Sequence, residues 1–340
     1  EQQVSAARET LRLIEQNVLL DAATAYMNLL RDTAILELQR SNVAVLVEQL
    51  RQTRDRFSVG EVTRTDVAQA ESRLAAGRSQ LATAEANFTN SRAVYRRVIG
   101  VEPGKLAAAS PVDRLSPPTL PGAINSGRAN NPNVTAAMFG IDVQALQVKI
   151  NEGALYPVLT VTANAQQNWE SSPLIKQQTN ASLIGQMTVP IYRGGLFYSA
   201  VRQAKETLTQ RRFDLETARD QIQAAVVQAW GNLDAAKAQI AATQAQVSAA
   251  EIALNGVREE ARVGQRTTLD VLNAQQELVN ARVALVTAQR DRVVASFNLL
   301  SSVGRLSPGN LGLPTSVYDP MNHYQQVRDV WAGVRTPDGK

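Results

Sequence analysis

The 340-residue chain has a formal net charge of +4, 5% aromatic residues and no cysteine. The absence of cysteine excludes a disulfide framework and a thiolate metal site, and the scattered arginines without a long basic run argue against nucleic-acid binding. No stretch reaches the roughly 18 apolar residues of a transmembrane helix. Plentiful Ala, Val, Leu and Gln favour long helices packed through small side chains.

A long helix is expected first, from Val4 to about Arg56, because this stretch contains neither proline nor glycine. Apolar residues recur there at steps of three and four, as on one face of a helix. About 55 helical residues would extend about 80 Å. The helical pattern is already under way at Glu1, so no signal peptide is expected within this sequence.

A turn follows at Gly60, and a second helix is expected to run from there almost to Gly100. Thr63 or Thr65 can cap its start, and Asp66 would lie near its positive end. The two helices predict a long antiparallel hairpin whose tip is the turn at Gly60.

The composition changes after this hairpin. The stretch SPPTLPG, residues 116–122, predicts a linker outside any helix. A shorter helix is expected to begin at Asn131 and Pro132.

Between residues 156 and 192 the apolar period changes from 3.6 to 2, which predicts a β-hairpin. One face of the strands is apolar, formed by Leu159, Val161, Ala163 and Ala165 and by Leu183, Met187, Val189 and Ile191. Strands of about ten residues suit a membrane-spanning hairpin, with Tyr156, Trp169 and Tyr192 where an interfacial aromatic girdle would lie. A hairpin with one face on a protein core explains the alternation equally well.

The sequence of the helical hairpin is then repeated. RFSVGEVTRTDVAQA (residues 56–70) and EARVGQRTTLDVLNA (residues 260–274) share the string V-G-x-x-T-x-x-D-V-x-x-A. Gly60 and Gly264 lie 204 positions apart, and the register holds without a gap along both hairpins. A repeat of this length indicates a duplicated half-domain rather than a solenoid unit of about 20–50 residues.

The expected organisation follows from the repeat. Residues 1–110 form a first repeat with a helical hairpin only, 111–125 a linker, 126–306 a second repeat with a short helix, the β-hairpin 156–192 and the helical hairpin 197–303, and 307–340 a C-terminal tail. The expected fold class is mainly α with a small β part.

This organisation resembles the TolC family of outer-membrane factors over residues 1 to about 306. The two tips in tandem are the most specific part of the resemblance. Three further strings add to it: PIYRGG at residues 190–195, N-P-x-V from Asn131 and L-Y-P-V-L from Leu155. The tail VYDPMNHYQQVRDVWAGVRTP is similar to that of members associated with type I secretion. The resemblance implies a homotrimer whose strands close one β-barrel in outer-membrane lipid and whose helices form an α-barrel tunnel through the periplasm.

One feature departs from the family. Its members carry a strand pair in each repeat, whereas this sequence carries only the second, and by the repeat offset Glu1 corresponds to Lys205. A segment of about the size of residues 125–204 is therefore expected to be missing ahead of Glu1. The sequence is then a fragment or a truncated form, or the ordered portion of a chain that starts earlier.

The resemblance implies a passive exit duct of a tripartite export system, for type I protein secretion or multidrug efflux, in the outer membrane of a Gram-negative bacterium. Its implied partners are a periplasmic adaptor and an inner-membrane ABC or RND transporter. A periplasmic coiled-coil adaptor or scaffold without a channel is the alternative, which the β-hairpin disfavours. No general acid–base pair, nucleophile, phosphate loop or metal spacing is present, so neither an enzyme nor a cofactor is expected.

The resemblance also assigns roles at the tips. The adaptor would dock beside Val59, Gly60, Val263 and Gly264. Asp66, with Thr65 beside it, and Arg266 would hold the gate shut. The family has a tyrosine as a further gate partner, and this sequence has Ala261 at that position, so one tie is missing.

The resemblance also implies a pore constriction lined by two acidic residues one helical turn apart. Asp270 matches the first of two acidic residues that line it, but Asn273 replaces the second. Gathered carboxylates attract cations, so fewer of them predict a weaker effect. Asp66 and Asp270 can alternatively be no more than helix caps.

Overall fold

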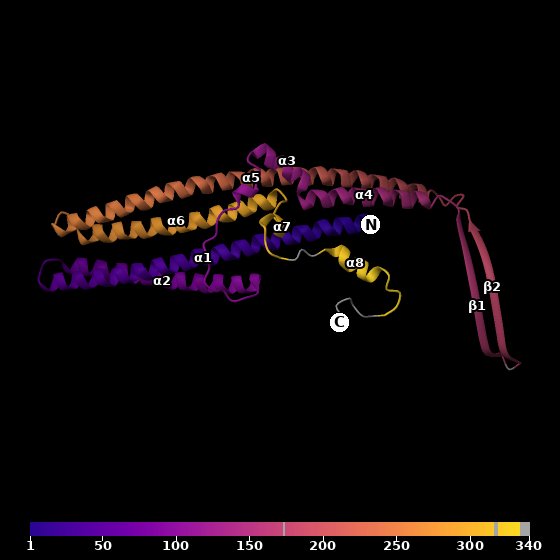
Figure 1. The fold of residues 1–340 in the computed structure, drawn as a ribbon, viewed down its shortest axis with the longest axis horizontal. Helices are drawn as coiled ribbons and strands as arrows, with labels where there is room; N and C mark the ends of the chain where they lie inside the picture. The colour runs from indigo at the N-terminus through magenta and orange to yellow at the C-terminus, as the bar shows by residue number, and fades with distance from the viewer. Residues whose placement is uncertain (173, 316–318, 334–340) are drawn as a thin grey trace. The chain divides into compact units, whose positions relative to one another are not determined.

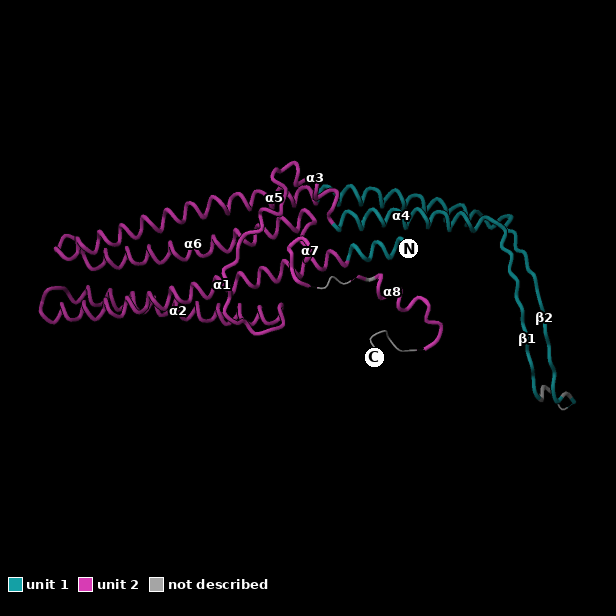
Figure 2. Tube along the Cα trace, viewed as in Figure 1, with its two compact units in different colours: residues 1–10, 132–221 teal, residues 11–131, 222–340 magenta. Residues whose placement is uncertain are grey.

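The structure, a computed structural model, describes residues 1–172, 174–315 and 319–333. The chain divides into two compact units, residues 1–10 with 132–221 and residues 11–131 with 222–340 (Figure 2).

Four long helices make up most of the chain. They are α1 (Gln2–Ser58), α2 (Arg64–Ile99), α5 (Leu196–Arg262) and α6 (Thr268–Ser302). The bounds expected from glycine and proline positions are confirmed to within a few residues, and so is the mainly helical fold class. None of the described helices holds an apolar stretch long enough to cross a membrane.

In the unit of residues 11–131 and 222–340, these helices form two antiparallel hairpins (Figure 1). The first hairpin is α1 with α2, joined by an ion pair between Arg54 and Glu71 at 2.6 Å. The second hairpin is α5 with α6, joined by an ion pair between Arg282 and Glu251 at 2.8 Å. Both pairs are exposed and contribute little stability, so apolar burial along the helices holds each hairpin closed.

The two hairpins also pack against each other within this unit. Leu272 of α6 is buried in a cluster with Leu46 and Leu50 of α1 and Ala70 and Leu74 of α2. The first hairpin therefore offers a groove between its helices, and α6 fills it near the tip.

The connection between α2 and the next long helix is more ordered than the sequence predicts. A short 3-10 helix, η1 (Asp113–Leu115), is followed by α3 (Leu120–Asn130). The expectation that residues 116–122 stay outside any helix is wrong at its end. Thr119 caps α3 by accepting from the Gly122 N–H, and Pro121 fits the first turn, where a missing N–H costs nothing.

α3 packs on the second hairpin through a small apolar core. Ala123 of α3 is buried with Val226, Ala229 and Leu233 of α5, with Leu299 of α6 and with Val303, the C-cap residue of α6. Apolar burial at positions three and four apart explains why this proline-containing segment forms a helix against α5 and α6.

The other unit contains α4 (Pro132–Gly153) and the β-hairpin. α4 starts at the expected Pro132 and packs along the first turns of α5, where Gln144 Nε2 donates to the Ala204 carbonyl at 3.4 Å and Lys205 pairs with Glu152 at 3.1 Å.

The β-hairpin pairs β1 (Val158–Ser172) with β2 (Ile175–Thr188) in antiparallel register. Both strands exceed the expected ten residues. The register sets Leu159 opposite Met187 and Ala163 opposite Leu183, so the predicted apolar positions inside the strands share one face. Val189 and Ile191, which were predicted to continue that face, lie beyond the end of β2. Leu159 and Leu183 are 71% and 76% exposed, so no part of the described chain covers that face.

Two short helices, α7 (Pro308–Leu311) and α8 (Pro320–Arg328), follow the second hairpin. The predicted tail also includes residues 316–318 and 334–340, which lie outside the described residues.

Candidate docking and gate site at the hairpin tips

Each hairpin turns through a glycine in the left-handed backbone region. Gly60 has a φ of 78° and Gly264 a φ of 80°, which L side chains seldom adopt. Each glycine N–H donates to the carbonyl three residues earlier, at 3.0 and 3.2 Å. The first tip (residues 59–66) and the second tip (residues 263–270) therefore have the same turn.

A capping box opens the helix after each turn. Thr63 Oγ1 accepts from the Asp66 N–H at 3.3 Å, and the Asp66 carboxylate accepts from the Thr63 N–H at 2.8 Å. Thr267 and Asp270 repeat this exchange at 3.2 and 2.9 Å. Of the two threonines that the sequence offered, Thr63 and not Thr65 is the cap.

The same hydrogen bonds set the charge of the two carboxylates. The Thr63 hydroxyl and then the Thr63 N–H hold the pKa of Asp66 below its usual range. The Thr267 N–H and then its hydroxyl do the same for the pKa of Asp270. Donors that stabilise the ionised form lower a carboxyl pKa, so both tips carry a fixed negative charge at neutral pH.

Apolar side chains beside the glycines are open to solvent. Val59 is 77% exposed and Val263 is 71% exposed. Each tip thus presents a valine, a glycine without neighbours to its missing Cβ and a capped carboxylate.

The predicted gate residues lie at both tips without touching one another. Arg266 Nε donates to the Glu260 carboxylate at 2.8 Å, and this pairing raises the pKa of the guanidinium. Among the described residues, no hydrogen bond or ion pair joins Arg266 to Asp66 or Thr65. The gate therefore stays a prediction.

The predicted constriction residues lie one helical turn apart on α6, where Asp270 is occupied in its capping box. Asn273 instead reaches the first hairpin, since its Oδ1 accepts from Arg73 Nη2 at 2.6 Å. Its amide oxygen therefore serves a contact between the hairpins in this chain.

Two partners at this site, Arg73 and Glu260, were not predicted from the sequence. Both lie on expected helical faces, and their roles depend on which side chains the packing brings close. The Thr-x-x-Asp spacing at Thr63 and Thr267, by contrast, is a capping-box signature that is visible in the sequence.

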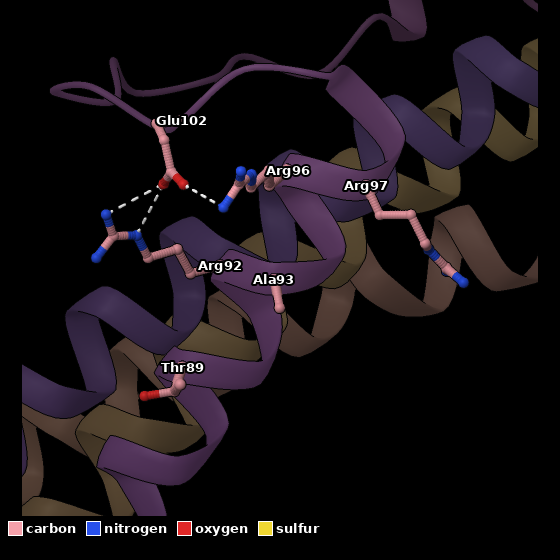
Figure 3. Close-up of a pocket in the computed structure, with 6 residues that line it drawn as sticks. All are labelled: Thr89, Arg92, Ala93, Arg96, Arg97 and Glu102. Atoms are coloured by element: carbon pink, nitrogen blue, oxygen red, sulfur yellow. Dashed lines mark hydrogen bonds and ion pairs between the residues drawn. The ribbon is translucent and has the colours of Figure 1, made fainter.

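A different hollow, of about 510 Å³, lies at the other end of α2 (Figure 3). It is lined by Thr89, Arg92, Ala93, Arg96, Arg97 and Glu102. Glu102 lies between Arg92 and Arg96, with an ion pair of 3.1 Å to each (Figure 3). The described residues contain no group of three or more His, Cys, Asp or Glu placed to hold a metal ion. The tips are therefore the stronger candidate site.

Comparison with known protein families decides the identity. The model of the family described as outer membrane efflux protein matches residues 1–101 and 123–305. The chain belongs to this family. Membership confirms the resemblance that the two tips indicated, and it confirms the expected location in the outer membrane. The family consists of efflux proteins.

Named relatives agree with this assignment. The chain is 42% identical to outer membrane efflux protein BepC of Brucella suis, across 100% of this chain and 75% of the relative. It is 26% identical to outer membrane protein TolC of Escherichia coli over 89% of this chain and 64% of TolC. It is 25% identical to alkaline protease secretion protein AprF of Pseudomonas aeruginosa over 90% of this chain and 65% of AprF.

Solved structures share the fold at lower identity. CusC matches with a TM-score of 0.77 and 18% identity over 89% of this chain and 72% of CusC. The Campylobacter jejuni CmeC outer membrane channel matches with a TM-score of 0.77 and 17% identity, over 96% of this chain and 69% of CmeC.

Proposed function

We propose that this chain is the exit duct of a tripartite export system, a passive channel that a periplasmic adaptor opens at the hairpin tips. Family membership over both repeats supports the channel, and the duplicated tips with exposed Val59 and Val263 carry the docking role. Because the proposed duct is passive, an inner-membrane ABC or RND transporter supplies the energy for export. One relative is named as an efflux protein and another as a protease secretion protein. These names support the two export classes that we propose, multidrug efflux and type I protein secretion.

The duct requires self-assembly into a homotrimer. A two-stranded hairpin leaves unpaired backbone groups along both edges, and such edges are not tolerated in lipid. The uncovered apolar face of the β-hairpin fits outer-membrane lipid. Light scattering of the full-length protein in detergent should give the mass of three chains, whereas a monodisperse monomer would refute the duct.

Docking is proposed at the tip surface formed by Val59, Gly60, Val263 and Gly264. A bulky residue at either glycine would block close approach of an adaptor's helical backbone. Gly60→Trp and Gly264→Trp should therefore abolish export in cells while the trimer still forms.

Gly100→Trp is the matched control for this experiment. Gly100 has a φ of 86° and nothing within 4 Å of its missing Cβ, so the backbone strain is the same at a position away from both tips. If export survives both tip substitutions, or if Gly100→Trp abolishes it equally, docking at the tips is contradicted.

Asp66, Thr65 and Arg266 are proposed to hold the closed state between neighbouring hairpins. Arg266 carries its charge on an exposed side chain at the second tip, and its present partner Glu260 is also exposed. Exposed ion pairs are weak and exchange at little cost, so Arg266 can move to the Asp66 carboxylate as the tips approach.

Asp270 is proposed to line the constriction, with Asn273 leaving a single carboxylate per chain there. Replacing Asp270 with alanine should reduce cation preference and block by multivalent cations in planar bilayers, because the negative charge at the mouth is removed. Unchanged selectivity would leave Asp270 with its capping role alone.

A further inference from the structure

The exposed hollow at the end of α2 carries an excess of positive charge. It is lined by three arginines, one glutamate, one threonine and one alanine, so two positive charges have no negative counterpart among the lining residues. The tip of this hairpin lies at the opposite end of α2. The hollow therefore belongs neither to the proposed docking surface nor to the proposed gate.

Glu102 shows which chemical group the arginines accept. Its Oε2 accepts from Nε and Nη2 of Arg92 at 3.2 and 3.1 Å, and its Oε1 lies 3.1 Å from Nη1 of Arg96. One carboxylate thus bridges two guanidinium groups that lie one helical turn apart (Figure 3). The guanidinium fork matches the geometry of a carboxylate, so this pair of arginines forms a carboxylate site.

An incoming carboxylate can take the place of Glu102. The side chains of Arg92, Arg96 and Glu102 are all about half exposed or more, and exposed ion pairs are weak. Glu102 follows the helix end at Gly100 and lies in a segment that contains neither helix nor strand before η1. Its displacement therefore requires a local change in this segment and no movement of a helix.

Arg97 offers a further positive charge to a ligand. Its guanidinium points away from Glu102 (Figure 3), and no hydrogen bond or ion pair joins its side chain to another residue in the described part of the chain. Ala93, one helical turn before Arg97, is exposed and small. A ligand with two carboxylates can therefore pass over Ala93 and reach both the arginine pair and Arg97.

The internal repeat shows that a hairpin end folds without these charges. At the 204-residue offset, the three arginines and the glutamate correspond to four uncharged residues, Ser296, Leu300, Ser301 and Leu306. Ser296, Leu300 and Leu306 are fully buried. The charged set thus occurs only in the repeat whose helix end is open, where a ligand can reach it.

We propose that this hollow binds an acidic peptide segment that carries at least two carboxylates. One carboxylate replaces Glu102 between Arg92 and Arg96, and a second pairs with Arg97. The hollow of about 510 Å³ is lined by exposed side chains, so it admits an extended peptide from solvent. The site is independent of the proposed duct and of adaptor docking at the tips.

The proposal makes Glu102 an internal competitor of the ligand. Glu102→Gln should therefore tighten peptide binding, whereas Arg96→Gln should weaken it about fivefold, the scale of one exposed ion pair. The gain from Glu102→Gln should shrink when Arg96 is also replaced, because the competitor acts through that arginine. Attraction by net charge alone would give the same gain in both backgrounds, and this result would overturn the site.

Fluorescence polarisation of the full-length protein in detergent measures this binding. The probe is a hexapeptide of alternating glutamate and glycine, blocked at both ends and labelled with a neutral dye. It should bind with an affinity that falls as salt rises, and the same peptide with glutamine in place of glutamate should not bind. Inorganic phosphate is the competing anion, and displacement of the peptide by an equal concentration of phosphate would overturn a carboxylate site.

The ion pair between Arg54 and Glu71 supplies matched control variants, because it is similarly exposed and lies on the same hairpin. Arg54→Gln and Glu71→Gln make the same changes in charge and should leave the peptide affinity unchanged. A gain of affinity cannot come from a misfolded variant, so Glu102→Gln keeps the test decisive. Equal effects at the two ion pairs, or no gain in Glu102→Gln, would contradict the proposal.

Discussion

The two helical hairpins have the same tip, but they differ at their far ends, where α2 and α6 finish. At the tips, the turns agree within a few degrees and both helices begin with a Thr–Asp capping box. The ion pair across each turn differs in polarity and in span, since Arg56 pairs with Glu61 five residues later and Glu260 pairs with Arg266 six residues later.

At the far ends the repeat positions lie in opposite surroundings. Arg92 and Arg96 at the end of α2 surround Glu102 in an exposed hollow. Their equivalents Ser296 and Leu300 on α6 are fully buried. Ser296 Oγ accepts from the Val112 N–H at 3.1 Å, in the segment that leads through η1 to α3.

This difference separates local from non-local causes. A tip needs only a glycine with positive φ and a Thr-x-x-Asp spacing, so two sequences with different charges fold it alike. The far end depends on what packs against it, so the same helix position is an exposed arginine in one copy and a buried leucine in the other.

The largest expected effect lies at the far ends, in the glycines that end α2 and α6. A Cβ on Gly304 would lie 2.6 Å from the Asn130 carbonyl oxygen and 2.7 Å from the Asn131 Cα, whereas one on Gly100 would meet nothing within 4 Å. Both glycines have positive φ. Gly304→Ala should cost roughly 2–5 kcal/mol from strain and overpacking together, and Gly100→Ala about 1–2 kcal/mol from strain alone.

Thermal unfolding followed by circular dichroism measures both costs. Equal melting temperatures for the two variants would show that packing around α3 does not distinguish the far ends.

A smaller and equal effect is expected at the two tips. Thr63→Ala and Thr267→Ala each remove an N-cap hydroxyl, at a cost of about 1 kcal/mol. Amide hydrogen exchange in the first turns of α2 and α6 should increase by a similar factor in both. A clear difference between the two tips would contradict their structural equivalence.

The smallest expected effect is the pH dependence of the tips. The folded pKa values of Asp66 and Asp270 lie below the ordinary one. Their stabilisation is therefore complete above the usual aspartate pKa of about 3.9 and is lost as pH falls through the lowered folded values. Local opening at both tips should increase below about pH 4, and Asp66→Asn with Asp270→Asn should flatten this response.

The elements that local residues determine could be predicted from the sequence. A run without glycine or proline predicted α1, the glycines at positions 60 and 100 bounded α2, and the internal repeat predicted α5 and α6. The period-2 alternation predicted the β-hairpin. α3 was missed because three prolines and a glycine in residues 116–122 suggest a linker, while burial of Ala123 against α5 and α6 stabilises the helix.

The tip residues were found through the repeat and the family resemblance, but their partners were not. Whether Arg266 pairs with Glu260 or Asp66, and whether Asn273 faces a pore or Arg73, depends on how helices distant in sequence pack together. Spacing along one helix carries no signal for such contacts.

Single-channel conductance in planar bilayers tests the central claim, a duct held shut at its tips, most directly. Asp66→Ala and Arg266→Ala should each raise the conductance of the trimer, because the tie between neighbouring hairpins is lost. Glu48→Ala is the matched control. Hydrogen bonds from Arg51 and then Gln52 lower the pKa of Glu48 to about 2, so this variant also removes one carboxylate charge, but from an exposed position of α1 about three helical turns before its end at Ser58. It should leave conductance unchanged. Conductance that stays at the wild-type value in both tip variants would contradict the gate.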